Sequence, residues 1–434
     1  MSIKDQAAIL NKLGIASLNP MQEEAQKAIS SQSEVVLLSP TGTGKTLAFL
    51  LPLIQTLDPT LAEVQLLIIV PSRELAIQIE QVTREMGSGF KTNAVYGGRA
   101  GSKDKIDIKH RPAILIGTPG RLADHIRREN FATNYIQALV LDEFDKSLEI
   151  GFTVEMEEIL LSMPPLQKKV LTSATQGVEI PGFAGLKSSQ VIDYLKDENT
   201  QLKIRSIISP SKDKLDTLLQ AICQLGNEPG IIFCNFKDSI ERVSDFLTEN
   251  GIAHGRFYGG MEQQDRERAL IKFRNGTHRL LLATDLAARG IDVPEIRFII
   301  HYHLPTRDHE FIHRNGRTAR MNQDGVAYII QWEHEELPDF IAQPEIEELT
   351  ESSLPGRPAW KTLYISGGRK DKISKGDIAG LFFRQGDLKH DELGIIELKQ
   401  DSAFVAVKAT KAEKLIGLLN NTRLKKRKVR VSHI

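Results

Sequence analysis

Residues 39–46 read Ser39-Pro40-Thr41-Gly42-Thr43-Gly44-Lys45-Thr46. They follow the apolar run Val35–Leu38 and precede a stretch with helical periodicity over Lys45–Leu57. A glycine-rich turn between a strand and a helix lets backbone N–H groups approach phosphate oxygens, which a Cβ would obstruct. Lys45 supplies a cation for the phosphates, and the Thr46 hydroxyl suits a magnesium ligand. We therefore expect this turn to bind a nucleotide, although Ser39 replaces the first glycine of the strict pattern; a chance glycine-rich turn is the alternative.

Short apolar runs rich in β-branched residues recur along the chain, and helical patterns separate them. Runs that are apolar at every position are typical of parallel strands buried on both faces of a sheet. Alternating strands and helices imply doubly wound α/β domains, whose ligands bind at the carboxyl ends of the strands. The runs are Val35–Leu38, Leu66–Val70, Ala113–Ile116, Ala138–Leu141, Gly230–Cys234, Leu280–Ala283 and Phe298–Ile300.

The runs fall into two groups, which a pause in the pattern around residues 197–213 separates. We therefore expect two tandem α/β domains with parallel sheets, over residues 1–200 and 212–342. The acidic, proline-containing residues 343–359 predict a linker. Residues 360–434 show a β-α-β-β-α-β order, which suggests a small α+β domain with the ferredoxin-like fold of RNA-recognition domains.

Charge is unevenly distributed along the chain, although it carries 56 basic and 56 acidic residues. Residues 361–434 hold 17 Lys/Arg and 8 Asp/Glu, whereas the remainder holds 39 and 48. A separate basic domain of this kind indicates a polyanionic partner, and a solubilising tail is the other interpretation.

Composition disfavours several classes of protein. No apolar run reaches the roughly 18 residues of a membrane span, and the first residues lack the apolar core of a secretion signal. The two cysteines, Cys223 and Cys234, fit neither a disulfide framework nor a zinc site with the histidines. We expect a cytoplasmic, monomeric protein with reduced thiols, no zinc and no membrane segment.

Further candidate site residues follow the strands of both domains. Asp142-Glu143 closes the run Ala138–Leu141, where one carboxylate could organise a metal's water shell and the other could accept a proton from water. Residues 313–320 read His313-Arg314-Asn315-Gly316-Arg317-Thr318-Ala319-Arg320. Arginines from a second domain could stabilise charge on a terminal phosphate and make hydrolysis depend on domain closure. A solvated turn and a solvated basic face are the alternatives.

These motifs, in this order, resemble those of the DEAD-box RNA helicases over about residues 10–340. The resemblance implies two RecA-like domains and an RNA-dependent ATPase that separates short RNA duplexes locally. The matching stretches are Asn19–Gln22, Ser39–Thr46, Pro71–Ala76, Gly97–Gly98, Thr118–Arg121, Asp142–Asp145, Ser173–Thr175, Ile231–Phe236, Gln263 with Arg266, Ala283–Asp292 and His313–Arg320.

The resemblance also implies which residues bind the nucleotide. Gln22 would contact the adenine edge, which makes ATP the nucleotide, and Asp292 would contact the ribose. Residues Thr41, Gly42, Thr43, Gly44 and Lys45 would surround the phosphates. Thr46 and Asp142 would hold Mg²⁺.

Catalysis and RNA binding are assigned in the same way. Glu143 would be the general base, and Lys45, Arg317 and Arg320 would supply catalytic charge once the domains close. Coupling between hydrolysis and RNA would run through Asp145, Ser173, Thr175 and His313. The RNA path would be lined by Arg73, Gly98, Thr118, Arg121 and Thr284, chiefly against phosphates and sugars.

The chain departs from the family pattern at several positions. Asp5 stands where the family has an aromatic residue upstream of Gln22, and Gly14-Ile15 replaces Gly-Phe, so adenine stacking would be weakened. Phe144 replaces the alanine of the motif that names the family. Because overpacking costs about 1–3 kcal/mol unless neighbours shrink, we expect a compensated site.

The basic C-terminal segment contains the stretches Thr362–Ile365, Gly367–Lys370, Gly376–Ile378, Gly394 and Phe404-Val405. In these it resembles the RNA-binding domain of bacterial DbpA-type DEAD-box proteins, which implies structured ribosomal RNA as the substrate, during ribosome assembly. We expect RNA contacts from two basic loops, whose residues are Arg369, Lys370, Lys425, Lys426 and Arg427. Phe404 and Tyr364 could stack on bases or belong to the core. A nuclear import signal is another interpretation of residues 425–428.

Two other functions fit the same residues. One is a clamp that binds RNA without efficient ATP hydrolysis, which Phe144 and the missing aromatic residue would favour. The other is a DNA-translocating helicase. The intact Lys45, Glu143, Arg317 and Arg320 favour ATP hydrolysis over the clamp.

Overall fold

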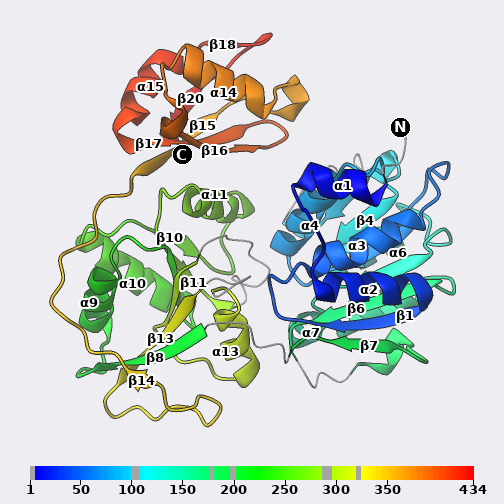
Figure 1. Cartoon of the computed structure of the whole chain (residues 1–434), viewed down its shortest axis with the longest axis horizontal. Coiled ribbons are helices and arrows are strands. Elements are labelled where there is room, and N and C mark those ends of the chain that lie inside the picture. The colour runs from blue at the N-terminus through cyan, green and yellow to red at the C-terminus, as the bar shows by residue number, and fades with distance from the viewer. Residues whose placement is uncertain (1–4, 99–107, 176–179, 196–201, 286–295, 319–323) are drawn as a thin grey trace. The chain divides into compact units, whose positions relative to one another are not determined.

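The computed structural model describes residues 5–98, 108–175, 180–195, 202–285, 296–318 and 324–434. The chain divides into two compact units, of which the first contains residues 1–200 and the second contains most of residues 201–434. Each unit is built on a seven-stranded sheet, and the second unit carries a further four-stranded sheet (Figure 1). Among the described residues, no helix is both long and apolar enough to cross a lipid bilayer.

The sheet of the first unit has the strand order β3-β4-β2-β5-β6-β1-β7, and every pairing is parallel. Its strands are β1 (Glu34–Leu38), β2 (Leu66–Ile69), β3 (Thr92–Val95), β4 (Ile114–Gly117), β5 (Ala138–Leu141), β6 (Lys168–Ser173) and β7 (Gln190–Asp193). The helices are α1 (Gln6–Leu13), α2 (Pro20–Ser31), α3 (Lys45–Gln55), α4 (Arg73–Met86), α6 (Pro119–Arg127), α7 (Phe144–Glu149) and α8 (Thr153–Leu161).

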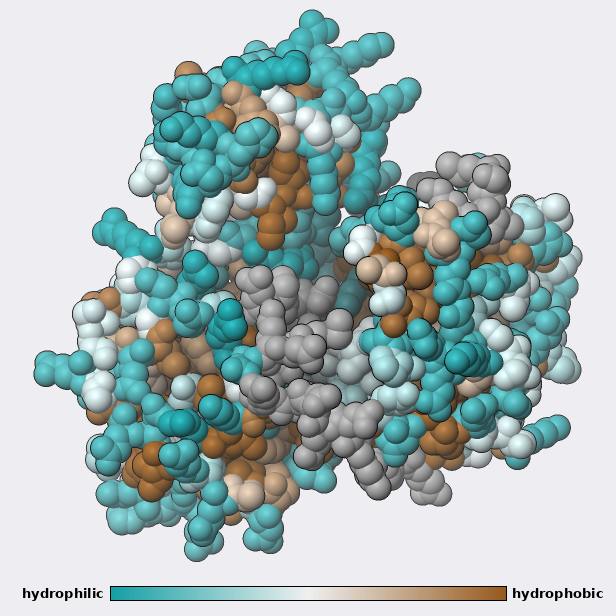
Figure 2. All heavy atoms as spheres, viewed as in Figure 1, coloured by the Kyte–Doolittle hydropathy of each residue, from teal (hydrophilic) through white to brown (hydrophobic). Residues whose placement is uncertain are grey.

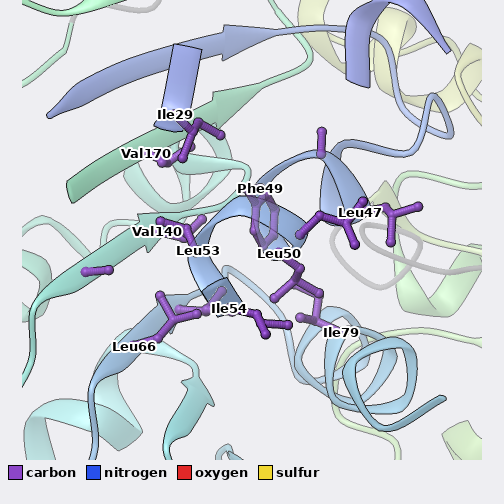
Figure 3. Close-up of a cluster of buried hydrophobic side chains, with 14 of the residues drawn as sticks. Ile29, Leu47, Phe49, Leu50, Leu53, Ile54, Leu66, Ile79, Val140 and Val170 are labelled. Carbon is purple, nitrogen blue, oxygen red and sulfur yellow. The ribbon is translucent and has the colours of Figure 1, made fainter. Parts of the chain in front are cut away.

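Both faces of this sheet are buried, which explains why its strands are apolar at every position. Along β2, Leu66 and Ile68 belong to one hydrophobic cluster, and Leu67 and Ile69 belong to another. Successive side chains of a strand point to opposite faces, so each face has its own core. Figure 3 shows the first cluster, in which residues of α3 such as Phe49 pack near strand residues of the sheet.

The large sheet of the second unit has the order β10-β11-β9-β12-β13-β8-β14, again with parallel pairings. Its strands are β8 (Leu202–Ser209), β9 (Gly230–Phe233), β10 (His254–Phe257), β11 (Leu280–Ala283), β12 (Phe298–His301), β13 (Gly325–Trp332) and β14 (Glu345–Ile346). The helices include α9 (Leu215–Leu225), α10 (Lys237–Glu249), α11 (Gln263–Arg274) and α13 (Asp308–Asn315). Because β14 lies within residues 343–359, part of the expected linker extends this sheet.

The C-terminal domain has an antiparallel sheet of order β16-β17-β15-β20. Its elements are β15 (Trp360–Ile365), α14 (Lys375–Arg384), β16 (Leu393–Leu398), β17 (Ala403–Lys408), α15 (Ala412–Leu419) and β20 (Val431–His433). A small hairpin, β18 (Arg423–Leu424) with β19 (Arg427–Lys428), comes between α15 and the last strand. The expected α/β class, with two parallel-sheet domains and a small α+β domain, is thus confirmed.

Candidate nucleotide and RNA site

The glycine-rich turn lies between β1 and α3, as the sequence predicts. Gly42 and Gly44 have φ values of 86° and 87°, in the left-handed region that favours glycine. A Cβ on Gly44 would lie 2.3 Å from Nε2 of Gln22, so a larger residue would collide there. The turn leads into the N-terminus of α3, where backbone N–H groups favour an anion.

Lys45 is buried and donates hydrogen bonds to the phosphate loop itself. Its Nζ lies 2.5 Å from the carbonyl oxygen of Ser39 and 2.8 Å from that of Pro40. Burial lowers the pKa of Lys45 to about 8, although neighbouring carboxylates oppose this shift. Ser39, in the place of a glycine, is fully buried, and its hydroxyl lies 2.8 Å from Oγ1 of Thr43. The serine thus fits the loop through a hydrogen bond.

Gln22 contacts the same loop from α2. Asn19 and Gln22 form a capping box at the start of this helix. Nε2 of Gln22 donates to the carbonyl oxygen of Gly44 at 3.2 Å, and Nδ2 of Asn19 donates to that of Thr43 at 3.0 Å. The predicted adenine contact therefore lies beside the predicted phosphate site.

Asp142 and Glu143 follow β5 and are buried. Oγ1 of Thr172, on β6, donates to Oδ1 of Asp142 and accepts from the backbone N–H of Glu143 at 3.1 Å. Burial, followed by the charge of Glu143, raises the pKa of Asp142 to about 6. A carboxylate without solvent and beside another acid is stabilised by a cation, so the site suits a bound metal.

The predicted coupling residues of the first unit form one hydrogen-bonded group. Oγ1 of Thr175 donates to Oδ2 of Asp145 at 2.9 Å, and the backbone N–H of Thr175 donates to Oγ of Ser173 at 3.0 Å. Asp145 lies on α7, the short helix that Glu143 caps, so the hydrogen bond from Thr175 joins the segment after β6 to the helix that follows the predicted general base.

Phe144 and Asp5, two of the departures from the family pattern, have clear structural roles. The Phe144 side chain is 2% exposed and belongs to the hydrophobic cluster beneath α6 and α8. Asp5 caps α1, since its Oδ1 accepts from the backbone N–H of Ala8 at 2.8 Å. The ring of Phe144 is accommodated in the core, and a catalytic site that works with this ring beside it stays a prediction.

The RNA-contact residues predicted in the first unit follow adjacent strands. Arg73 begins α4 after β2, Gly98 comes after β3, and Thr118 caps α6 after β4, with Arg121 in its first turn. These strands are neighbours in the order β3-β4-β2, so their carboxyl ends share one edge of the sheet. A Cβ on Gly98, which has a φ of 82°, would lie 2.4 Å from Nη1 of Arg73.

Arg314 in the second unit was not among the expected site residues, although it is the most connected. It is 1% exposed, and its Nε and Nη2 donate to the two carboxylate oxygens of Asp285 at 2.6 and 2.5 Å. It also donates to Oδ1 of Asn235 at 2.8 Å and to the carbonyl oxygen of His303 at 2.7 Å. A buried cation with this many acceptors holds β9, β11 and α13 together. The arginine-rich residues 313–320 indicate a functional segment, but their sequence alone favours Arg317 and Arg320 as the catalytic arginines and does not single out Arg314.

The other expected residues of the second unit are distributed as follows. His313 is buried in the last turn of α13, and Arg317 is buried just after this helix. Thr284 follows β11, and its backbone N–H donates to the carbonyl oxygen of Phe257. Asp292 and Arg320 lie outside the described residues.

The two basic loops of the C-terminal domain meet on one surface. We define the basic surface as Arg369, Lys370, Lys372 and residues 425–428. Nζ of Lys425 donates to the carbonyl oxygen of Lys372 at 2.6 Å and pairs with Asp377 at 2.7 Å, while Arg427 pairs with Asp371. Lys425, followed by Ser374, lowers the pKa of Asp377 to about 2. In Figure 2, hydrophilic side chains cover the end of the domain where β18 lies.

The sheet of the C-terminal domain has an aromatic pair on the face opposite its core. Tyr364 and Phe404 are cross-strand neighbours with ring centroids 5.7 Å apart, and Phe404 is buried. On the same face, Oγ1 of Thr362 lies 2.7 Å from Oγ1 of Thr277, just after α11. Arg274 of α11 forms two hydrogen bonds with Glu397, at 2.8 and 3.0 Å. This sheet face therefore contacts the second α/β domain.

Comparison with known proteins agrees with the three-part organisation. Residues 19–180 match the DEAD/DEAH box helicase family, residues 213–322 match the helicase conserved C-terminal domain, and residues 362–433 match the DbpA RNA binding domain. The ATP-dependent RNA helicase DbpA of Escherichia coli is 30% identical over 97% of this chain and 95% of its own length. The protein of the same name from Bacillus subtilis is 29% identical over 98% of this chain and 96% of its own length.

Solved structures show the same similarity. Dbp5 of S. cerevisiae bound to RNA and ADP BeF3 matches with a TM-score of 0.68 and 26% identity, over 76% of this chain and 88% of that one. The DEAD-box helicase Mss116 bound to ssRNA and UDP-BeF matches with a TM-score of 0.70 and 25% identity, over 81% of this chain and 79% of that one.

Proposed function

This chain belongs to the family of DEAD-box ATP-dependent RNA helicases, and we propose that it remodels structured RNA by cycles of RNA-stimulated ATP hydrolysis. The observation that carries the proposal is the buried network of the first unit. It connects the phosphate-loop lysine, the acids after β5 and the Ser173–Thr175 segment within one site.

The residues of this site divide the work of ATP binding. On binding, Lys45 would exchange the carbonyl oxygens of Ser39 and Pro40 for phosphate oxygens, and Gln22 would contact the adenine. Thr46 and Asp142 would hold Mg²⁺, which neutralises phosphate charge when bound. The raised pKa of Asp142 supports this role, because a cation would replace its missing solvation.

Glu143 would act as the general base by accepting a proton from the attacking water. Arg317 and Arg320 would stabilise charge on the terminal phosphate once the two units close on ATP and RNA. Hydrolysis would then depend on RNA, because RNA bound by both units favours closure. Asp145 and Thr175 would transmit this state to the base.

We further propose that the C-terminal domain selects the RNA through its basic surface, and that structured ribosomal RNA during ribosome assembly is the substrate. The similarity to the DbpA RNA binding domain and the exposed cations of residues 425–428 support this, although Lys425 and Arg427 are paired with Asp377 and Asp371. The sheet face is a poorer candidate, since α11 contacts part of it. A cytoplasmic location, a monomeric state and the lack of zinc stay predictions.

The test compares the ATPase rate of the full chain with that of the Glu143→Gln variant, with and without structured RNA. We expect RNA to stimulate the parent and the variant to lose about 10²–10⁴-fold in kcat, the usual contribution of a general base. Equal rates in the two proteins would contradict hydrolysis and favour an RNA clamp. Stimulation by DNA equal to that by RNA of the same sequence would contradict the choice of substrate.

A further inference from the structure

A lysine with no role in the proposed mechanism is buried beside the predicted general base. Lys146, on α7, is 0% exposed and is among the largest fully buried side chains in the described residues. Its Nζ lies 3.0 Å from Oε2 of Glu143, whose side chain is 7% exposed. Burying an ammonium group costs several kcal/mol unless it is paired and hydrogen bonded, so this contact is specific.

The second cation of the site cannot replace Lys146 in this contact. Nζ of Lys45 is directed at the carbonyl oxygens of Ser39 and Pro40, and in the proposed function it moves to phosphate. Three carboxylates, those of Asp142, Glu143 and Asp145, act electrostatically on Lys45 together with the charge of Lys146. Lys146 is therefore the cation in direct contact with the Glu143 carboxylate in this structure.

The backbone around Glu143 gives this contact a positional role. Glu143 has φ 49° and ψ 49°, a left-handed conformation that is uncommon outside glycine, and it caps the N-terminus of α7. Its N–H is held by Thr172, so the backbone is fixed. The Lys146 contact, one helical turn along, then fixes the carboxylate at the end of a flexible side chain.

We propose that Lys146 is a positioning residue, which holds one carboxylate oxygen of Glu143 so that the group is oriented toward the attacking water. This inference rests on the proposed function of Glu143 as the general base. A displacement of about 1 Å in a catalytic group can cost about 10²-fold in rate, so the contact matters for kcat. The charge of Lys146 also acts on Asp142, but Gln22 and the phosphate loop would supply the contacts to ATP itself, so we expect the main effect on kcat and not on ATP affinity.

The experiment uses the full chain carrying Lys146→Met, which keeps most of the length of the side chain and removes its charged terminal group. We expect kcat for RNA-stimulated ATP hydrolysis to fall about 10–100-fold, with the KM for ATP and the dissociation constant of ATP unchanged within about twofold. Lys27→Met, at an exposed position on α2, is the matched control and keeps the parent kcat.

A second measurement needs no nucleotide. The unfolding temperature should fall more when Lys146→Met is made in the parent than in the Glu143→Gln background, because only the parent leaves a buried carboxylate uncompensated. If Lys146→Met does not fold, Lys146→Leu, which likewise removes both the charge and the hydrogen-bond donor, replaces it under the same criteria.

The outcomes separate the two proposals. Parent kcat in the Lys146 variants, or a loss shared equally between kcat and ATP affinity, overturns the positioning role while leaving the proposed function intact. A parent protein no faster than Glu143→Gln overturns the proposed function and this inference with it. Additive effects of the two substitutions on unfolding temperature overturn the pairing itself.

Discussion

Replacing Phe144 by alanine would give the chain the residue found in the motif that names its family, yet we expect this change to be damaging. The ring is 2% exposed inside a hydrophobic cluster of the first unit, so its removal leaves a cavity. Phe→Ala changes at such sites cost about 3–5 kcal/mol. For a domain of this size each kcal/mol lowers the unfolding temperature by about 2–4 °C, so a decrease of about 6–20 °C is expected.

Differential scanning calorimetry of the full chain can measure this decrease. The chain holds several domains, so its unfolding is not two-state, and the transition of the first unit is identified by its increase when ATP and Mg²⁺ are added. Leu161→Ala, at a position of the first unit that is 79% exposed, is the matched control and should change stability by less than about 0.5 kcal/mol. Equal unfolding temperatures for the two variants would refute the packing argument, because they would mean that the ring fills no necessary space.

Three further predictions concern single contacts. The pKa of Asp142 is raised to about 6, so its carboxylate is protonated at lower pH and cannot help to hold Mg²⁺. As the pH rises toward 6, the affinity for ATP with Mg²⁺ should therefore increase about tenfold per pH unit, and above 6 it should level off. Calorimetric titrations should show that Asp142→Asn removes this pH dependence. Since the pKa of Asp142 in the folded state lies above its ordinary value of 3.8, protonated Asp142 stabilises the fold below pH 3.8. This contribution is lost as the pH rises through about 6, and the loss can be measured as a decrease in the unfolding temperature. Arg274→Glu should destabilise the second unit by about 1–3 kcal/mol through loss of its two hydrogen bonds to Glu397, and adding Glu397→Arg should restore the unfolding temperature. Lys426→Gln should weaken the binding of structured RNA and reduce the slope of log affinity against log salt concentration by about 0.7–0.9. The control Lys414→Gln, on α15, should change neither, and an unchanged slope for Lys426→Gln would exclude a phosphate contact.

The nucleotide site shows how far sequence reasoning reaches. The turn between a strand and a helix, and the acids at the end of another strand, were predictable because parallel strands direct their carboxyl ends to one edge. The structure adds the distances that place Gln22, Lys45 and Asp142 around one loop. Both parallel sheets were likewise predictable, since strands buried on two faces must be apolar throughout.

Other features could not be predicted, because they depend on contacts between distant residues. Lys146 looks like an ordinary surface lysine in sequence, and only its burial shows that it pairs with Glu143. Arg314 and Arg317 look alike in sequence, and only the structure shows that the acceptors of Arg314 come from three separate segments, at Asn235, Asp285 and His303. The pairing of Glu345 and Ile346 with β8 was hidden because two residues carry no periodicity.

The hydrogen bonds that Lys45 makes to its own loop have a consequence for phosphate binding. The Nζ of Lys45 already has two acceptors, the carbonyl oxygens of Ser39 and Pro40. A phosphate oxygen that binds Lys45 replaces such a bond and adds no new one, so the exchange contributes less free energy than binding to a lysine in solvent would. The backbone N–H groups of the loop therefore carry a larger share of the affinity for phosphate than the lysine charge alone suggests.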